Sequence, residues 1–397
     1  MVIKKKSIAL FLVTCMILGA ALAGCGGGAG DSSEGLIKIG VSTPLSAPGD
    51  TMGGGINVNT LKLATQEIND AGGVDGRKVE LVIGDDAGTV SKGVSLVQKF
   101  ATTDKVSAIL GVWHGPVASA QATAADEFKV PIMSHYSWPD DFTEAHSDYV
   151  FRVSPYNSQI AELVFPFILK KGYKHVAVVA EDGSFGMGYA NALQAEGDKN
   201  GVQVSVRIVP TSSVDPSPQL IELKNMNPAP DLLVVASVYQ LMYTIPKQAR
   251  AVGLDCEILA SWDYPSWDDQ FWPNVGDAGL GIYYPSFYSP TMTLTESGQK
   301  FQAAYRDAYG ESPPIYAYFL YDEFMMVMQV IKEKSSSDPR DVAEGLADIS
   351  FNGTTGVIEF TRDTAPGPKW NQWLGHQIFV FQLEHYGDMG DEAVLVH

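Results

Sequence analysis

The sequence predicts an α/β protein made of two doubly wound parallel-sheet lobes, joined by a hinge that the chain crosses several times. Short apolar runs alternate with stretches in which apolar residues recur every three or four positions, a pattern typical of alternating strands and helices. The series pauses near Tyr149 and then starts again with the same character. The repetition predicts two similar lobes, and the chain is long enough to give each its own core.

Four strand-like segments open the first series, with helical spacing between them, for example at Leu61, Ala64 and Ile68. They are LIKIGVSTP (36–44), KVELVIGDDA (78–87), VSAILGVW (106–113) and VPIMSHYS (130–137). Strands that alternate with helices pair in parallel, so these segments predict the first sheet. The second series follows the pause at YVFRVSPYNSQ and consists of HVAVVAED (175–182), VQVSVRIV (202–209), DLLVVASV (231–238) and CEILAS (256–261).

The last third of the chain turns helical after GLGIYYPSFYSP (279–290) and ends with two short strand candidates, GVIEFT and QIFVFQLEH. No linker composition introduces this segment. We therefore expect it to complete the first lobe, with the last strand crossing to the second. The predicted N-terminal lobe is 36–154 plus 286–372, and the predicted C-terminal lobe is 155–285 plus 373–397.

The N-terminus has the layout of an export signal, with basic residues Lys4–Lys6 before an apolar run that is too short for a membrane span. Leu22-Ala23-Gly24-Cys25 resembles the bacterial lipobox, in which the cysteine is lipidated. This predicts a lipoprotein signal peptide at 1–24 and a flexible Gly/Ser tether at 25–35. An ordinary cleaved signal with a chance cysteine is the alternative.

Cysteine content and charge limit the remaining classes. Once Cys15 leaves with the signal and Cys25 carries lipid, Cys256 is alone, so the exported part has no intramolecular disulfide and depends on its core. The formal charge is −19, from 27 Lys and Arg against 46 Asp and Glu. An acidic surface repels phosphate backbones, so we expect no nucleic-acid partner.

Several segments together resemble the type I periplasmic binding proteins of the leucine/isoleucine/valine-binding group. The resemblance rests on IGVSTPLSAPGD, on INDAGGVDGRKVEL with the pair Asp85-Asp86, on HVAVVAEDGSFGMGYA, and on KQARAVGL before CEILAS, and it covers most of residues 36–375. It implies a solute-binding lipoprotein of an ABC importer, a candidate for branched-chain amino acids, which hands its solute to permease and ATPase subunits. The implied location is the outer face of the cytoplasmic membrane, with no cofactor.

The resemblance also implies where the solute binds. Ligands of open parallel sheets lie beyond the carboxyl ends of strands, and in this family first-lobe hydroxyl and N–H groups take a solute carboxylate while a second-lobe acid takes the ammonium. Carried over by position, the ligand-binding residues are Trp113, His114, Gly115, Tyr136, Ser137, Trp138, Phe185, Tyr239, Trp262 and Asp263.

The sequence departs from the family pattern at this site. Gly115 stands where a serine is common, Trp138 stands near a usual threonine, and either Trp262 or Asp263 occupies the place of the acid. Aromatic faces favour apolar rings or desolvated cations. We therefore expect a zwitterionic or cationic solute, and aromatic molecules are among the candidates. His114 would bind its anionic end and Asp263 its cationic end.

Two other classes of function remain open. A sensor that presents its solute to a membrane kinase or chemoreceptor would have the same binding lobes, and neighbouring genes would distinguish it from a transporter component. A lipid-anchored hydrolase could use His114 with Asp263 or Asp182 but lacks a marked nucleophile. The glycines of GSFGMG do not fit a dinucleotide turn, and the histidines have no metal-type spacing, so we expect no enzyme and no metal site.

Overall fold

The structure, a computed structural model, describes residues 35–397. The predicted signal peptide, Cys25 and all but the last residue of the tether lie outside the described residues. Within residues 35–397, no helix is both long and apolar enough to cross a membrane.

The first sheet has five parallel strands in the order β2-β1-β3-β4-β5. Nearly every side chain of β1, β3, β4 and β5 is buried, as expected for parallel strands covered on both faces. The strands are β1 (Ile37–Thr43), β2 (Val79–Asp85), β3 (Ala108–Leu110), β4 (Ile132–Ser134) and β5 (Val150–Arg152), and the helices between them are α1 (Thr51–Asp70), α2 (Val90–Lys99), a π-helical turn (Phe100–Asp104), α3 (Gly115–Phe128) and α4 (Asp141–Glu144).

The second sheet has seven strands in the order β14-β13-β10-β9-β8-β6-β7. Strands β6 to β10 pair with one another in parallel, whereas β13 pairs antiparallel with β10 and β14 pairs antiparallel with β13. The strands are β6 (His175–Glu181), β7 (Gln203–Val209), β8 (Leu232–Ala236), β9 (Glu257–Ala260), β10 (Tyr283–Ser286), β13 (Phe379–Gln382) and β14 (Val394–Leu395). The helices are α5 (Asn157–Lys171), α6 (Ser184–Asn200), α7 (Ser217–Lys224), α8 (Tyr239–Val252) and α9 (Phe271–Val275), with 3₁₀ turns at Tyr264–Ser266, Gly276–Gly279 and Gly390–Glu392.

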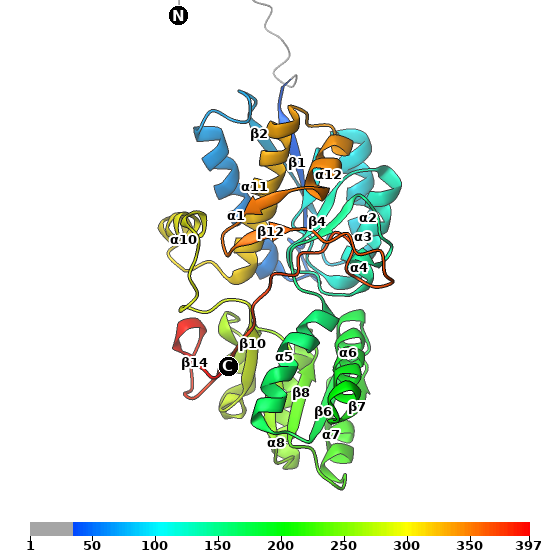
Figure 1. Cartoon of the computed structure of the whole chain (residues 1–397). Helices are drawn as coiled ribbons and strands as arrows, with labels where there is room; N and C mark the ends of the chain where they lie inside the picture. The colour runs from blue at the N-terminus through cyan, green and yellow to red at the C-terminus, as the bar shows by residue number, and fades with distance from the viewer. Residues whose placement is uncertain (1–34) are drawn as a thin grey trace, which may run out of the picture. The chain divides into compact units, whose positions relative to one another are not determined.

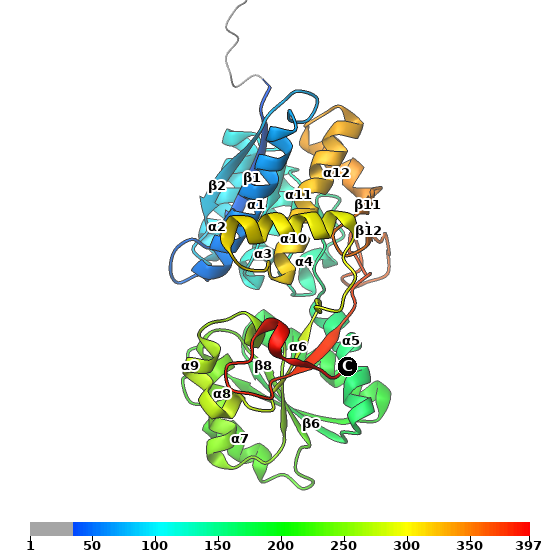
Figure 2. The ribbon, with the colours of Figure 1, turned by 90° about the vertical axis from the view of Figure 1, so that its left-hand side faces the viewer.

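The segment after β10 returns to the first sheet. It contains α10 (Glu296–Tyr309), α11 (Ile315–Lys334), α12 (Pro339–Ala347) and the hairpin β11 (Ser350–Asn352) with β12 (Val357–Glu359). Helix α11 is apolar on almost all sides and packs between α1 and α12. Figures 1 and 2 show this returning segment on the same lobe as α1. The chain therefore passes between the two sheets three times, after β5, after β10 and before β13.

The predicted fold class is confirmed, but one strand was not predicted. YVFRVSPYNSQ was expected to be a pause between the two series, but Val150–Arg152 forms β5, the fifth strand of the first sheet. Three residues that run straight into a Ser-Pro turn are too short to show a strand period. The lobe boundaries stay a prediction.

Each sheet has a point at which the strand order reverses, between β1 and β3 in the first and between β6 and β8 in the second. Ligands of open α/β sheets bind beyond the carboxyl ends of the strands at such points. Trp113 and His114 follow β3, and Glu181 ends β6, so both lobes bring their switch points to the site described next.

Candidate ligand-binding site

A cavity of about 450 Å³ lies beyond the carboxyl ends of the strands and takes its walls from both lobes. Its size is in the range of pockets for small organic ligands. The first lobe contributes Asp50, Met52, Trp113, His114, Gly115, Pro116, Tyr136, Ser137, Trp138 and Pro139. The second contributes Glu181, Gly183, Ser184, Phe185, Thr211, Val238, Met242, Tyr243, Trp262, Trp267, Asp268 and Gln270.

The structure brings eight of the ten predicted ligand-binding residues to this cavity. They are Trp113, His114, Gly115, Tyr136, Ser137, Trp138, Phe185 and Trp262. Asp263 is absent from its lining and instead borders a second cavity of about 410 Å³. Tyr239 begins α8, but the placement of its side chain is outside what the structure describes. Ligand contact by any of the ten stays a prediction.

The first-lobe wall is a group of packed aromatic rings. Trp113 stacks on Tyr136 with ring centres 4.2 Å apart, and Tyr136 meets the edge of Trp138 at 5.2 Å. Tyr316 of α11 packs against Trp113 and Tyr136, with ring centres 4.9 and 4.8 Å away. Such pairs hold each other in fixed orientations, so the wall is preformed.

A glycine in α1 makes room for this wall. A Cβ on Gly53 would lie 2.3 Å from the indole of Trp113. The helix backbone can therefore approach the ring only because the position lacks a side chain.

Rings of the second lobe meet those of the first. Trp138 lies 5.8 Å from Phe185 and 6.4 Å from Trp262, measured between ring centres. Trp262 is oriented by its indole N–H, which donates to the carbonyl of Ser237 at 3.2 Å. The lobes thus contact each other through aromatic rings beside the cavity.

Two predicted anion-binding groups of the first lobe are already engaged. The Nε2 atom of His114 accepts a hydrogen bond from the backbone N–H of Asp50 at 3.1 Å, so this nitrogen carries no proton. Burial lowers the pKa of His114, which favours the neutral ring at pH 7. The backbone N–H of Ser137 donates to the hydroxyl of Ser134 at 2.9 Å.

The cavity also contains three carboxyl groups. Asp50 caps α1 and accepts the N–H groups of Met52 and Gly53, both at 3.1 Å on Oδ1. Glu181 accepts the N–H groups of Gly186 at 3.2 Å and Val238 at 3.3 Å.

Asp268, the third carboxyl group, accepts the hydroxyl of Tyr243 and the N–H of Gln270. Burial raises the pKa of both Glu181 and Asp268. A cation in the cavity would favour their ionised forms.

Asp263 is held away from this group of carboxyls. It is 5% exposed, its Oδ1 accepts the indole N–H of Trp267 at 3.3 Å, and burial raises its pKa to about 6. The reason for its position is local, because β9 ends at Ala260 and the 3₁₀ turn Tyr264–Ser266 follows. Asp268, which comes after that turn, lines the cavity instead.

Comparison with known proteins identifies the architecture around this cavity. The family model for periplasmic binding proteins matches residues 36–388. The chain belongs to the periplasmic binding protein family.

Several individual proteins are similar to this family member. Leu/Ile/Val-binding protein homolog 3 of Brucella melitensis is 32% identical over 167 residues, which are 42% of this chain and 45% of that protein. Leu/Ile/Val-binding protein homolog 7 of Brucella abortus is 23% identical over 330 residues, which are 79% of this chain and 82% of that protein. The chain thus spans less than half of the first relative and most of the second.

Solved structures share the fold. Leucine-binding protein LivK of Thermotoga maritima superposes with a TM-score of 0.77 at 24% identity, covering 91% of this chain and 98% of that one. The isoleucine complex of LivJ from Streptococcus pneumoniae gives 0.75 at 23%, covering 91% and 99%. A benzoate complex of a solute-binding protein from Rhodopseudomonas palustris gives 0.74 at 21%, covering 91% and 96%.

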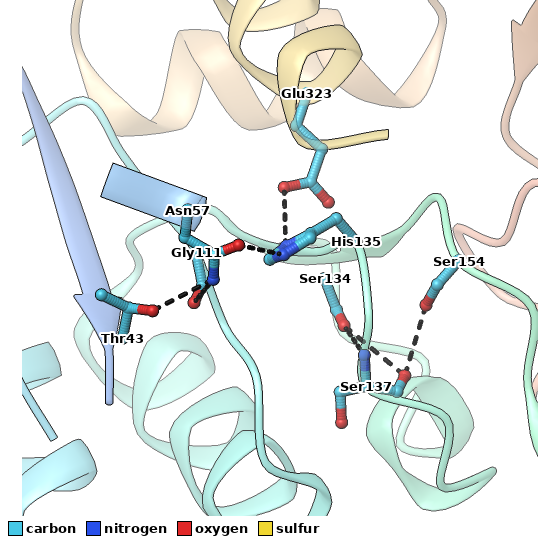
Figure 3. Close-up of polar contacts among 8 residues, drawn as sticks. All are labelled: Thr43, Asn57, Gly111, Ser134, His135, Ser137, Ser154 and Glu323. Carbon is cyan, nitrogen blue, oxygen red and sulfur yellow. Dashed lines mark hydrogen bonds and ion pairs between the residues drawn. The ribbon is translucent and has the colours of Figure 1, made fainter. Parts of the chain in front are cut away.

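Behind its cavity this periplasmic binding protein has a buried polar network that the sequence did not reveal (Figure 3). The Nε2 of His135 contacts Oδ1 of Asn57 at 3.0 Å, and the Asn57 amide donates to Thr43 and to the carbonyl of Gly111. Because Nδ2 of Asn57 is the donor in those two bonds, His135 donates through Nε2. The network ties the ends of β1 and β3 to the loop after β4, which contains Tyr136.

Glu323 of α11 faces the other side of the His135 ring, with 3.9 Å between Oε2 and Nδ1. Both side chains are fully buried. Burial lowers the pKa of His135 to about 3 and raises that of Glu323 well above its usual value. Burial thus favours the neutral form of both groups, and the network positions the binding loop.

Proposed function

We propose that the chain is an extracytoplasmic solute-binding lipoprotein of an ABC importer. It captures a small organic solute, an amino acid or a related amine or amide, between its two lobes and delivers it to the permease. The observation that carries this proposal is the cavity of about 450 Å³ that both lobes line at their sheet switch points. The family is one of binding proteins, and two structural neighbours, one with isoleucine and one with benzoate, hold small molecules.

The proposed mechanism is closure of the lobes around the solute. A solute that touches both lobes binds their closed arrangement more tightly and shifts the population toward it. Solute extracted from the purified protein and added back to the stripped chain should therefore reduce the radius of gyration measured by small-angle X-ray scattering.

Ser184→Trp is the matched control for this measurement. Ser184 lines the cavity at the start of α6, and its hydroxyl lies 3.5 Å from the position of a Cβ on Gly115 in the other lobe. An indole there should fill the cavity and abolish the change in radius. An unchanged radius for the wild-type chain at saturation would overturn the proposed mechanism.

Anchoring through Cys25 is a separate part of the proposal. It rests on the lipobox-like Leu22–Cys25 segment, because the structure does not describe these residues. Cys25→Ala should move the protein from the membrane fraction to the soluble fraction of cell extracts. A substituted protein whose signal is cleaved but which still sediments with membranes would contradict lipidation.

A further inference from the structure

We propose that the cavity selects a small organic cation that has an apolar body and no carboxylate. The inference rests on the proposed function and narrows it, because it excludes amino acids from the solutes considered above. It depends on three features of the cavity wall: its charged side chains, its aromatic rings and the hydrogen-bond donors that a solute carboxylate would need.

The charges of the cavity wall are of one sign. Asp50, Glu181 and Asp268 line it, and its described lining includes neither lysine nor arginine. Their side-chain hydrogen bonds come from neutral backbone N–H groups and a tyrosine hydroxyl. Among residues 35–397, none of the three forms an ion pair with a lysine or arginine. An organic cation would supply the missing positive charge.

Seven aromatic residues also line the cavity. They are Trp113, Tyr136, Trp138, Phe185, Tyr243, Trp262 and Trp267. The faces of such rings attract cations through their quadrupoles, most strongly where water is excluded, and they also cover apolar ligand surface. Rings and carboxylates together therefore fit a cation on an apolar body.

A solute carboxylate would find only neutral donors in the described lining of the same cavity. Those buried without a partner are the hydroxyls of Tyr136, Ser137 and Ser184 and the indole N–H of Trp138. The Nε2 of His114 is an acceptor and the N–H of Ser137 is used internally. Pro116, the second residue of α3, has no N–H, and the N–H of Ala118 donates to the carbonyl of His114. Neutral donors leave the charge of a buried carboxylate without a balancing cation, which is costly, and the carboxylates of the wall, Asp50, Glu181 and Asp268, would repel it.

Two sets of matched probes test the inference by calorimetric titration of the stripped chain. The first is 3-methylbutylammonium, leucine and 4-methylpentanoate, and the second is 2-phenylethylammonium, phenylalanine and 3-phenylpropanoate. Within each set the apolar body is constant while the charge changes from cation to zwitterion to anion. We expect an ammonium probe to bind at least tenfold more tightly than its amino acid and the carboxylate to bind most weakly.

Asp268→Asn should weaken binding of the ammonium probe at least tenfold without changing the midpoint of thermal unfolding by more than a few degrees. The control is Asp269→Asn, which removes the same charge from an exposed neighbour that does not line the cavity. Equal affinities of the two variants would overturn the role of Asp268.

The outcomes separate this inference from the proposed function. Tighter binding of an amino acid or carboxylate, or failure of both ammonium probes to bind, overturns the inference. A carboxylate in the solute extracted from the protein also overturns it, while closure of the lobes around that solute would leave the proposed function standing. Wild-type affinity for the ammonium probe in Ser184→Trp would contradict both.

Discussion

Replacing Arg152 with methionine is expected to lower the free energy of unfolding by about 3 to 5 kcal/mol. Arg152 is fully buried at the end of β5. Its guanidinium donates to Oε1 of Gln372 at 2.5 Å, to the carbonyl of Pro139 at 2.6 Å and to Oγ1 of Thr143 at 2.9 Å. Burial lowers its pKa to about 10, so the group is still charged at pH 7.

The large effect follows from what the substitution leaves behind. Methionine fills a similar volume, but the acceptors on Pro139, Thr143 and Gln372 lose a buried donor. Pro139 belongs to the loop that lines the cavity, and Gln372 precedes the last passage of the chain between the sheets. Arg152→Met should therefore weaken both the fold and the position of the binding loop.

Arg207→Met is the matched control, to be measured with Arg152→Met by urea unfolding. Arg207 is partly exposed, and its ion pair with Glu222 spans 2.8 Å. Such a surface pair contributes about 0 to 1 kcal/mol. Similar losses for the two variants would contradict the account of Arg152.

Alanine substitutions at three consecutive glycines of α1 are expected to have three different effects. A Cβ on Gly54 would lie 1.8 Å from the carbonyl oxygen of Pro44, whereas one on Gly55 would meet nothing within 4 Å. Gly54→Ala must push α1 away from the loop before it, at a cost of about 3 kcal/mol. Gly55→Ala should stabilise the protein by about 0.5 to 1 kcal/mol, because alanine has the higher helix propensity.

Gly53→Ala separates binding from folding in this series. Its Cβ would collide with the indole of Trp113, so the ring must shift within the cavity wall. We expect the affinity for solute to fall more than the unfolding midpoint does. Thermal unfolding and calorimetric titration of the three variants check the series, and a Gly54→Ala protein as stable as Gly55→Ala would show that α1 is placed differently.

The fold was largely predictable because parallel strands buried on both faces appear as continuous apolar runs. HVAVVAED and DLLVVASV, for example, became β6 and β8 at the centre of the second sheet. The short β5 was missed because three residues carry no period, and the pairing that makes it a strand is with β4. Its only sequence signal was a brief apolar run before a turn.

The site was predictable where it follows a strand and unpredictable where loops supply it. Trp113 and Trp138 come soon after β3 and β4, so the carboxyl-end rule placed them at the cavity. Asp50 and Asp268 lie in segments whose position depends on a helix cap and a 3₁₀ turn. Glu323 meets His135 only through the packing of α11 on the first sheet, which no local pattern shows.

Native mass spectrometry of the protein, purified without denaturation from the cells that naturally make it, tests most directly whether the cavity between the lobes holds a solute. The wild-type chain should carry one small organic molecule that denaturation releases, and Ser184→Trp should carry none. Retention of the same molecule by Ser184→Trp at wild-type occupancy would place it elsewhere. No bound molecule in the wild-type chain, even after incubation with concentrated medium from those cells, would contradict the account.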